Sequence, residues 1–328
     1  MSNESLNLVF NNSDSFFKRL KDILELLDSI KAQSYPRIET IVVVEKSKVL
    51  FNYVRKYAVE NTLQPVRVVF NYNDETGLSA ARNIGIQEAK GDIIAFVDDD
   101  ALLFPDWAEH MVETYEDSSV IGVTGPILPL WEEGVIAWFP RELDWILSCS
   151  GFSGLSCTAE VRNVYGTNMS FRRESFEKAG LFLTRLGARG GGETGKHELV
   201  GDETELSLRV RERTGKRILF NPQVKVSHRV YKYRVNSAFI ARRAYWEGYT
   251  KAMFKRTCRQ SGDTRLLSTE YGLLRRILTG LFPRILGGFF INPVVAWRRL
   301  SVTLVALSFV ALGYTGYLSR TAMAVIKL

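Results

Sequence analysis

The chain has 328 residues, of which 46% are apolar and 24% are charged. This ordinary globular composition excludes collagen-like, coiled-coil and wholly disordered proteins, and the length predicts two domains or one large α/β domain with extensions. The net charge of +7 suits anionic partners such as phosphates or a lipid surface; it does not single out nucleic acid, and we expect none as a partner. Three cysteines without C-x-x-C spacing indicate neither a disulfide framework nor a zinc site.

Strand and helix patterns alternate through the first hundred residues. We expect strands over residues 6–10, 39–44, 65–71 and 92–97. Helices are expected over residues 15–32, 49–60 and from Gly77 onwards, with Ser79 as the N-cap of the last. This alternation predicts right-handed crossovers and a mostly parallel sheet with helices on both faces.

Three consecutive aspartates, Asp98, Asp99 and Asp100, follow the strand predicted over residues 92–97. In open α/β sheets, ligands bind beyond the carboxyl ends of the strands. Side chains two apart on an extended segment point the same way, so Asp98 and Asp100 can share one hard divalent cation, Mg²⁺ or Mn²⁺, that bridges to a diphosphate. The alternative is a solvated acidic turn.

The stretch N-D-E-T-G-L-S-A-A-R-N-I-G-I over residues 73–86, followed by A-K-G-D-I-I-A-F-V-D-D-D-A over residues 89–101, resembles the signature of family 2 glycosyltransferases with the GT-A fold. The resemblance covers residues 36–250 and implies an α/β GT-A domain. It implies nucleotide-sugar-binding roles for Glu45, Arg82, Asn83, Gly85, Asp98, Asp99, Gly166 and Asn168. It also implies a metal site made of Asp98, Asp100 and His228.

A second acidic motif, G-D-E-T-E-L over residues 201–206, resembles the motif that carries the catalytic base in inverting members of that family. The family usually has the order E-D, so the base here is Glu203 or Asp202, and Glu203 is the better match. Asp202 could instead cap a helix that begins at Thr204. Where processive synthases carry Q-x-x-R-W, residues 243–248 read R-A-Y-W-E-G, which favours the transfer of a single sugar.

The C-terminal region contains an uncharged stretch over residues 301–318. Eighteen helical residues span about 27 Å, close to the thickness of a bilayer core. We expect one transmembrane helix there, an interfacial amphipathic segment over residues 273–300 and a tail over 319–328; a buried core helix is the alternative. The basic residues on the N-terminal side place the GT-A domain (residues 1–235) and a helical extension (236–272) on the cytoplasmic face of the cell membrane.

The resemblance therefore implies an inverting, metal-dependent enzyme that moves one sugar from a nucleotide sugar, with UDP expected, to a hydroxyl of a polyprenyl- or dolichyl-phosphate-linked glycan. This layout resembles that of archaeal enzymes that build N-glycans. Transfer to the bare lipid phosphate is an alternative, but an ionised phosphate needs no base. A further alternative is a P-loop-like nucleotide-binding protein, because residues 190–197 (G-G-G-E-T-G-K-H) approach that motif and fail it only at His197. We expect a flexible lid over residues 187–195.

Overall fold

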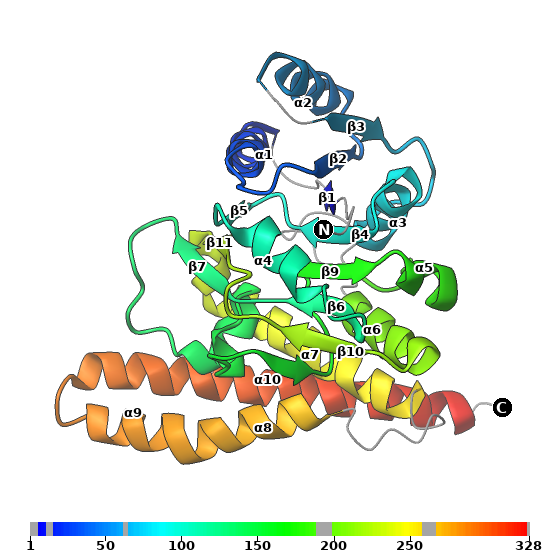
Figure 1. Ribbon diagram of the computed structural model, residues 1–328. Coiled ribbons are helices and arrows are strands. Elements are labelled where there is room, and N and C mark those ends of the chain that lie inside the picture. The colour runs from blue at the N-terminus through cyan, green and yellow to red at the C-terminus, as the bar shows by residue number, and fades with distance from the viewer. Residues whose placement is uncertain (1–5, 11–15, 62–64, 188–198, 258–266, 327–328) are drawn as a thin grey trace. The chain divides into compact units, whose positions relative to one another are not determined.

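The computed structural model describes residues 6–10, 16–61, 65–187, 199–257 and 267–326. The chain forms two compact units (Figure 1). The first contains residues 1–128 and 155–228, and the second contains residues 129–154 and 229–328.

The first unit is built on an eight-stranded sheet with the order β3-β2-β1-β4-β9-β6-β10-β8. Strands β1 (Leu6–Phe10), β2 (Ile38–Val44), β3 (Val66–Phe70) and β4 (Ile93–Val97) are mutually parallel and confirm the four predicted strands. Strand β9 (Asn168–Arg172) runs antiparallel to β4 and to β6 (Val120–Thr124). Strand β10 (Arg217–Phe220) is parallel to β6, and β8 (Ala159–Val161) is antiparallel to β10.

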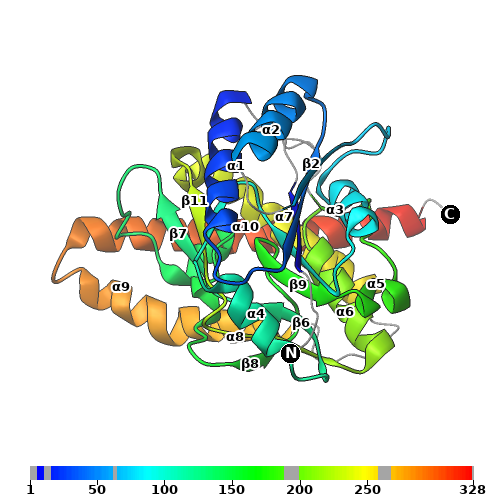
Figure 2. The same cartoon turned by 45° about the horizontal axis from the view of Figure 1, so that its top comes forward.

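Helices cover both faces of this sheet. Figure 2 shows α1 (Phe16–Lys31) and α2 (Lys48–Asn61) on one side of the parallel strands and α3 (Leu78–Glu88) on the other. The remaining helices of the unit are α4 (Trp107–Thr114), α5 (Glu174–Ala179) and α6 (Asp202–Thr214). Apolar side chains of α3, α5 and α6 pack in one buried cluster with Ile94 and Phe96 of β4 and Phe171 of β9. The expected two-sided α/β architecture is confirmed.

Helix α3 begins differently from the prediction. Its N-cap is Gly77, with φ 118° and ψ 171°, and no side chain caps it. Ser79 lies inside the first turn, and its hydroxyl donates instead to the backbone oxygen of Leu186 at 2.8 Å. The N-cap prediction was wrong because glycine permits the backbone geometry that starts the helix two residues earlier.

A second, three-stranded sheet has the order β5-β11-β7, with β5 (Ala101–Leu103), β11 (Val226–Val230) and β7 (Ile127–Trp131). Strand β5 follows the three aspartates directly. It runs antiparallel to β11, and this pairing sets Ala101 opposite His228.

Outside the ends of β7 and β11, the regular elements described in the second unit are helical. Short 3₁₀ segments cover Arg141–Leu147 (η1), Gly151–Ser153 (η2) and Lys232–Val235 (η3), and α7 covers Ser237–Thr257. Helix α8 (Ser268–Arg276), a π-helical turn (η5, Ile277–Leu281) and α9 (Phe282–Gly288) follow one another, and α10 runs from Pro293 to Ile326. Pro283 does not interrupt α9, because it lies in the first turn, where a missing N–H is tolerated. Among the described helices, one stretch, Pro293–Arg320, is long and apolar enough to cross a membrane.

Candidate active site

Three potential metal ligands meet beside the end of β4. Ligand atoms of Asp98, Asp100 and His228 all lie within 4.8 Å of one another. Nε2 of His228 is 3.1 Å from Oδ1 of Asp100, and both side chains are almost fully buried. The β5–β11 pairing explains this meeting, because it sets His228 opposite the residue that follows Asp100. Carboxylates suit Mg²⁺ and Mn²⁺, and an imidazole is a ligand of transition-metal ions, so the donor set fits a divalent cation.

The aspartates converge by a different route from the predicted one. Residues 98–100 form a turn, in which the backbone nitrogen of Ala101 donates to the oxygen of Asp98 at 3.0 Å, and they are not extended. The hydroxyl of Thr167 donates to Oδ2 of Asp98 at 2.7 Å and fixes this carboxylate. Asp99 is buried in the same turn and lies outside the three-residue group.

The second acidic motif opens helix α6. The helix begins at Asp202 itself, after Gly201 with φ 92°, and no side chain caps it. The alternative role of Asp202 as the cap of a helix starting at Thr204 was therefore wrong. Oδ2 of Asp202 lies 2.6 Å from a guanidinium nitrogen of Arg82, and both side chains are 4% exposed.

Glu203 has a different environment from its neighbour. Its side chain is half-buried. Burial, followed by the negative charge of Asp202, raises the pKa of Glu203 from 4.5 to about 8. A carboxylate with a raised pKa is a stronger base, and this is how proton acceptors are tuned for work near neutral pH. The carboxylate of Asp202 is instead engaged in a salt bridge with Arg82.

Arg82 joins the two acidic groups. One of its guanidinium nitrogens lies 3.7 Å from Oδ1 of Asp98 and donates to the backbone oxygen of Gly166 at 3.3 Å. Gly166 also borders Glu203, because a Cβ built there would lie 4.0 Å from the carboxyl carbon of Glu203. The structure thus brings Arg82, Gly166, Asp98, Asp202 and Glu203 into one cluster.

Glu45 and Asn71 follow β2 and β3 at the carboxyl edge of the sheet. Both oxygens of Glu45 accept from the backbone nitrogen of Gly77, at 3.2 and 3.1 Å, and Oε1 also accepts from Nδ2 of Asn71 at 2.9 Å. Burial raises the pKa of Glu45 above its usual 4.5. Together with Asp98 after β4, these residues occupy the edge at which open α/β sheets bind ligands.

Comparison with known proteins gives this site its context. Residues 15–180, just over half of the chain, match the family described as glycosyl transferase family 2. Over 250 residues the chain is 32% identical to a glucosyl-dolichyl phosphate glucuronosyltransferase of Haloferax volcanii, covering 76% of this chain and 77% of that protein. The chain belongs to glycosyl transferase family 2. The sequence resemblance to this family, and to archaeal enzymes linked to dolichyl phosphate, is therefore confirmed.

Two further matches agree. The glycosyltransferase is 27% identical over 193 residues to the succinoglycan biosynthesis protein ExoM of Rhizobium meliloti, covering 57% of this chain and 55% of that protein. Its fold matches the mannosyltransferase PcManGT from Pyrobaculum calidifontis, solved in complex with GDP-Man and Mn²⁺, with a TM-score of 0.61 and 19% identity. That match covers 96% of this chain and 87% of the other. The predicted GT-A fold is confirmed.

Three predicted ligand-binding residues of the glycosyltransferase hold its backbone. Asn83 accepts from the nitrogen of Phe182 and donates to its oxygen, both at 2.9 Å. Asn168 is fully buried, donates to the oxygen of Val224 and accepts from Nε1 of Trp107. Gly85 is buried within α3, where its oxygen accepts from Ala89. The structure does not bring these three residues into the cluster around Arg82.

Two residues of the site escaped the sequence analysis. Thr167 orients Asp98, and Asn71 donates to Glu45. The only sequence signal was the position of Thr167 between Gly166 and Asn168, in a stretch already matched to the family. A hydroxyl that acts by orienting another ligand leaves no motif of its own.

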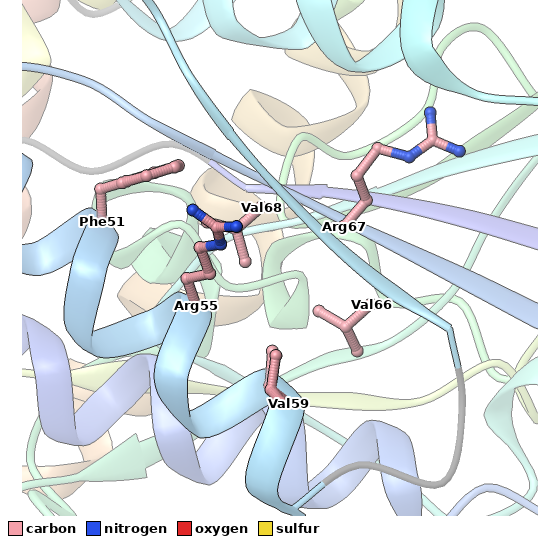
Figure 3. Close-up of a pocket in the computed structure, with 7 residues that line it drawn as sticks. Phe51, Arg55, Val59, Val66, Arg67 and Val68 are labelled. Carbon is pink, nitrogen blue, oxygen red and sulfur yellow. The ribbon is translucent and has the colours of Figure 1, made fainter.

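Two other candidate sites lie elsewhere. The P-loop-like run, with Lys196 and His197, and nearly all of the predicted lid fall outside the described residues, which stop at Gly187 and resume at Leu199. A hollow between α2 and β3 is lined by Phe51, Arg55, Ala58, Val59, Val66, Arg67 and Val68 (Figure 3). It contains none of the predicted site residues. The side chain of Arg67 points away from α2 and pairs with Glu39 and Glu88, each at 2.9 Å.

Proposed function

We propose that this glycosyltransferase is an inverting, metal-dependent enzyme that transfers one sugar from a UDP-sugar to a hydroxyl of a dolichyl- or polyprenyl-phosphate-linked glycan. The observation that carries the proposal is the joining of the Asp98–Asp100–His228 group to the Asp202–Glu203 pair through Arg82. The name of the Haloferax volcanii relative, glucosyl-dolichyl phosphate glucuronosyltransferase, supports a lipid-linked sugar as the acceptor and a hexuronic acid as the sugar transferred.

The donor end of the site is the metal group. Asp98, Asp100 and His228 would hold Mn²⁺ or Mg²⁺, and a cation there supplies positive charge to the diphosphate of the donor. The complex of PcManGT with GDP-Man and Mn²⁺ supports this assignment by fold analogy. Arg82 adds a fixed positive charge beside the same group. Glu45 and Asn71 lie at the edge of the sheet where the nucleobase of the donor is expected to bind.

The acceptor end is Glu203. Its carboxylate takes the proton of the acceptor hydroxyl as that oxygen bonds to the anomeric carbon and the bond to the nucleoside diphosphate breaks. The proton remains on Glu203, and the electron pair of the broken bond leaves with the diphosphate. The Arg82 ion pair with Asp202 keeps the start of α6, and hence Glu203, in place. Gly166 lies beside this carboxylate.

In this proposal the enzyme works at a membrane, and the first unit, which is the catalytic unit, lies on the cytoplasmic face. The lipid-linked acceptor requires contact with a bilayer. Residues 271–328 contain no Asp or Glu but seven Arg and Lys, which favours an anionic lipid surface.

Thermal unfolding with nucleotide and metal tests the donor site. UDP with Mn²⁺ is expected to raise the Tm of the full chain, whereas UDP alone has a smaller effect. Asp98→Asn with Asp100→Asn should abolish the metal-dependent part of the rise in Tm. The matched control Asp92→Asn, which replaces an exposed aspartate just before β4, should retain it. No metal-dependent shift in the wild-type chain would contradict the proposal.

Transfer itself is measured as UDP release from UDP-glucuronate and other UDP-sugars. The expected result is release with a glycosylated dolichyl phosphate as acceptor and none with dolichyl phosphate alone. Release with the bare lipid phosphate would support the alternative acceptor instead.

A further inference from the structure

The helices α8, α9 and α10 form a helical hairpin in the second unit. Figure 1 shows α8 and α9 running outward and α10 returning beside them. The tip between Gly288 and Pro293 contains the two most exposed large apolar side chains of the hairpin, Phe290 and Ile291, at 94% and 88%.

Each arm of the hairpin has one buried and one exposed apolar stripe. On α8, η5 and α9 the buried stripe is Ile277, Leu281 and Ile285, and α10 buries Ala296, Val302, Ala306 and Gly313. The exposed stripes consist of Tyr271, Leu274, Leu278 and Leu286 on the first arm and Val294, Trp297, Leu304, Leu312 and Leu318 on the second. A helix that only covers a soluble core has a polar outer face. The hairpin therefore has a second apolar surface that its own unit leaves exposed.

Salt links and close packing hold the hairpin against the rest of its unit along its length. Arg276 donates to the oxygen of Phe152, and Arg284 pairs with Glu142. Near the start of α10, Arg299 donates to the backbone oxygens of residues 137 and 138, at 2.9 and 3.1 Å. The hairpin does not project away from its unit as a free-standing membrane anchor.

Helix α10 packs on α7 at the centre of the apolar stretch predicted to cross the membrane. A Cβ at Gly248 would lie 2.0 Å from the oxygen of Val310, and one at Gly313 would lie 1.9 Å from the oxygen of Tyr245. The two backbones therefore touch at the middle of residues 301–318. If α10 crossed a bilayer there, this part of α7 would enter the hydrocarbon with it.

That part of α7 carries charges. Glu247 lies next to Gly248, and its carboxylate is 3.2 Å from Nζ of Lys251 and 3.6 Å from Arg243. Lys251 also pairs with Glu270 of α8 at 2.9 Å. Ionised side chains are costly in hydrocarbon, and α7 is not apolar enough to span a membrane. The packing thus disfavours a crossing at this point.

Positive charge accompanies the exposed stripes. Arg275, Arg298 and Arg320 are exposed on the hairpin, and no acidic residue follows Glu270 in the sequence. Basic side chains flanking an exposed apolar stripe with a tryptophan are typical of helices that lie in the headgroup region of an anionic bilayer.

We propose that the hairpin of residues 268–320 lies in the plane of an anionic membrane surface, dipping its exposed apolar stripes and the Phe290–Ile291 tip into one leaflet, and that α10 does not cross. In this arrangement both ends of α10 stay on the side of the catalytic unit. The predicted single crossing would instead place the C-terminal end of α10 on the opposite side.

Labelling in sealed membrane vesicles separates the two arrangements. The full chain carries Ser319→Cys and Cys258→Ser, and the native Cys157, exposed in the first unit, is the internal reference. A membrane-impermeant maleimide is expected to label position 319 and Cys157 on the same side of the membrane, before any detergent is added. Labelling of position 319 only after detergent, while Cys157 reacts at once, would overturn the proposal.

Vesicle flotation tests the surface itself without any sugar transfer, so it can fail independently of the proposed reaction. Phe290→Ser combined with Ile291→Ser should weaken binding of the purified chain to vesicles containing phosphatidylglycerol at least tenfold, with an unchanged thermal unfolding profile. Val135→Ser, which replaces an 81% exposed valine outside the hairpin, should bind like the wild type. The proposal is refuted if the double variant binds vesicles as the wild type does. It is also refuted if the wild type does not bind vesicles and instead forms dimers through the exposed apolar stripes of the hairpin.

Discussion

Replacing Glu203 by glutamine should abolish sugar transfer and stabilise the protein at the same time. The substitution keeps the size of the side chain and removes its charge and its basicity. General base catalysis contributes about 10²–10⁴-fold to rates, so kcat should fall by at least 100-fold. Binding of UDP with Mn²⁺ should persist, because Glu203 is not one of the three potential metal ligands.

The stability gain follows from the raised pKa of Glu203. Its pKa of about 8 in the folded chain, against an ordinary 4.5, means that the folded state prefers the protonated form. This preference contributes to the free energy of unfolding. The contribution is fully present below pH 4.5 and is lost as the pH rises through 8. At about 1.4 kcal/mol for each pH unit the loss is on the order of 4–5 kcal/mol at most, and partial exposure to solvent reduces it to about 1–2 kcal/mol.

Urea unfolding of Glu203→Gln and wild type at pH 5 and pH 8.5 measures this difference. The variant should gain about 1–2 kcal/mol over the wild type at pH 8.5 and almost nothing at pH 5. Glu205→Gln, two residues further along α6 and paired with Arg209 at 2.8 Å, is the matched control and should leave transfer unchanged. Full activity in Glu203→Gln, or equal stability effects at both pH values, would refute the assignment of this carboxyl as the base.

Three further substitutions test other parts of the structure. Asp202→Ala removes the nearest carboxylate of the buried guanidinium of Arg82, which keeps only the longer contact with Asp98, and should cost about 3–5 kcal/mol in urea unfolding; a loss below about 1 kcal/mol would contradict the buried pair. Thr167→Val frees the carboxylate of Asp98 and should weaken the Mn²⁺ dependence of UDP binding by about tenfold, with Thr167→Ser restoring it. Gly313→Val forces a side chain into the backbone of α7 and should lower stability by about 1–3 kcal/mol, whereas Gly287→Ala, facing open space, should not.

Local pattern was sufficient for the first half of the fold. The β-branched run of β2 and the helical spacing of α1 each act over a few residues, so alternation of the two periods predicted four parallel strands and their helices. The acidic residues after β4 and at the start of α6 could be found as well, because ligand sites of such sheets lie at the carboxyl ends of strands. Predictions failed where the local structure depended on the backbone conformation of a few residues. Gly77, and not Ser79, is the N-cap of α3, and residues 98–100 form a turn and not an extended segment.

The sequence by itself therefore determined the family, the α/β architecture and the residue types of the site. Only the tertiary structure decided which of those residues lie together. Thr167 contacts Asp98, 69 positions away in the chain, and Arg82 contacts Asp202, 120 positions away, and no local pattern encodes such contacts. The same holds for α10: its apolar length alone allows a membrane crossing, and its close packing on the charged helix α7 is what opposes one.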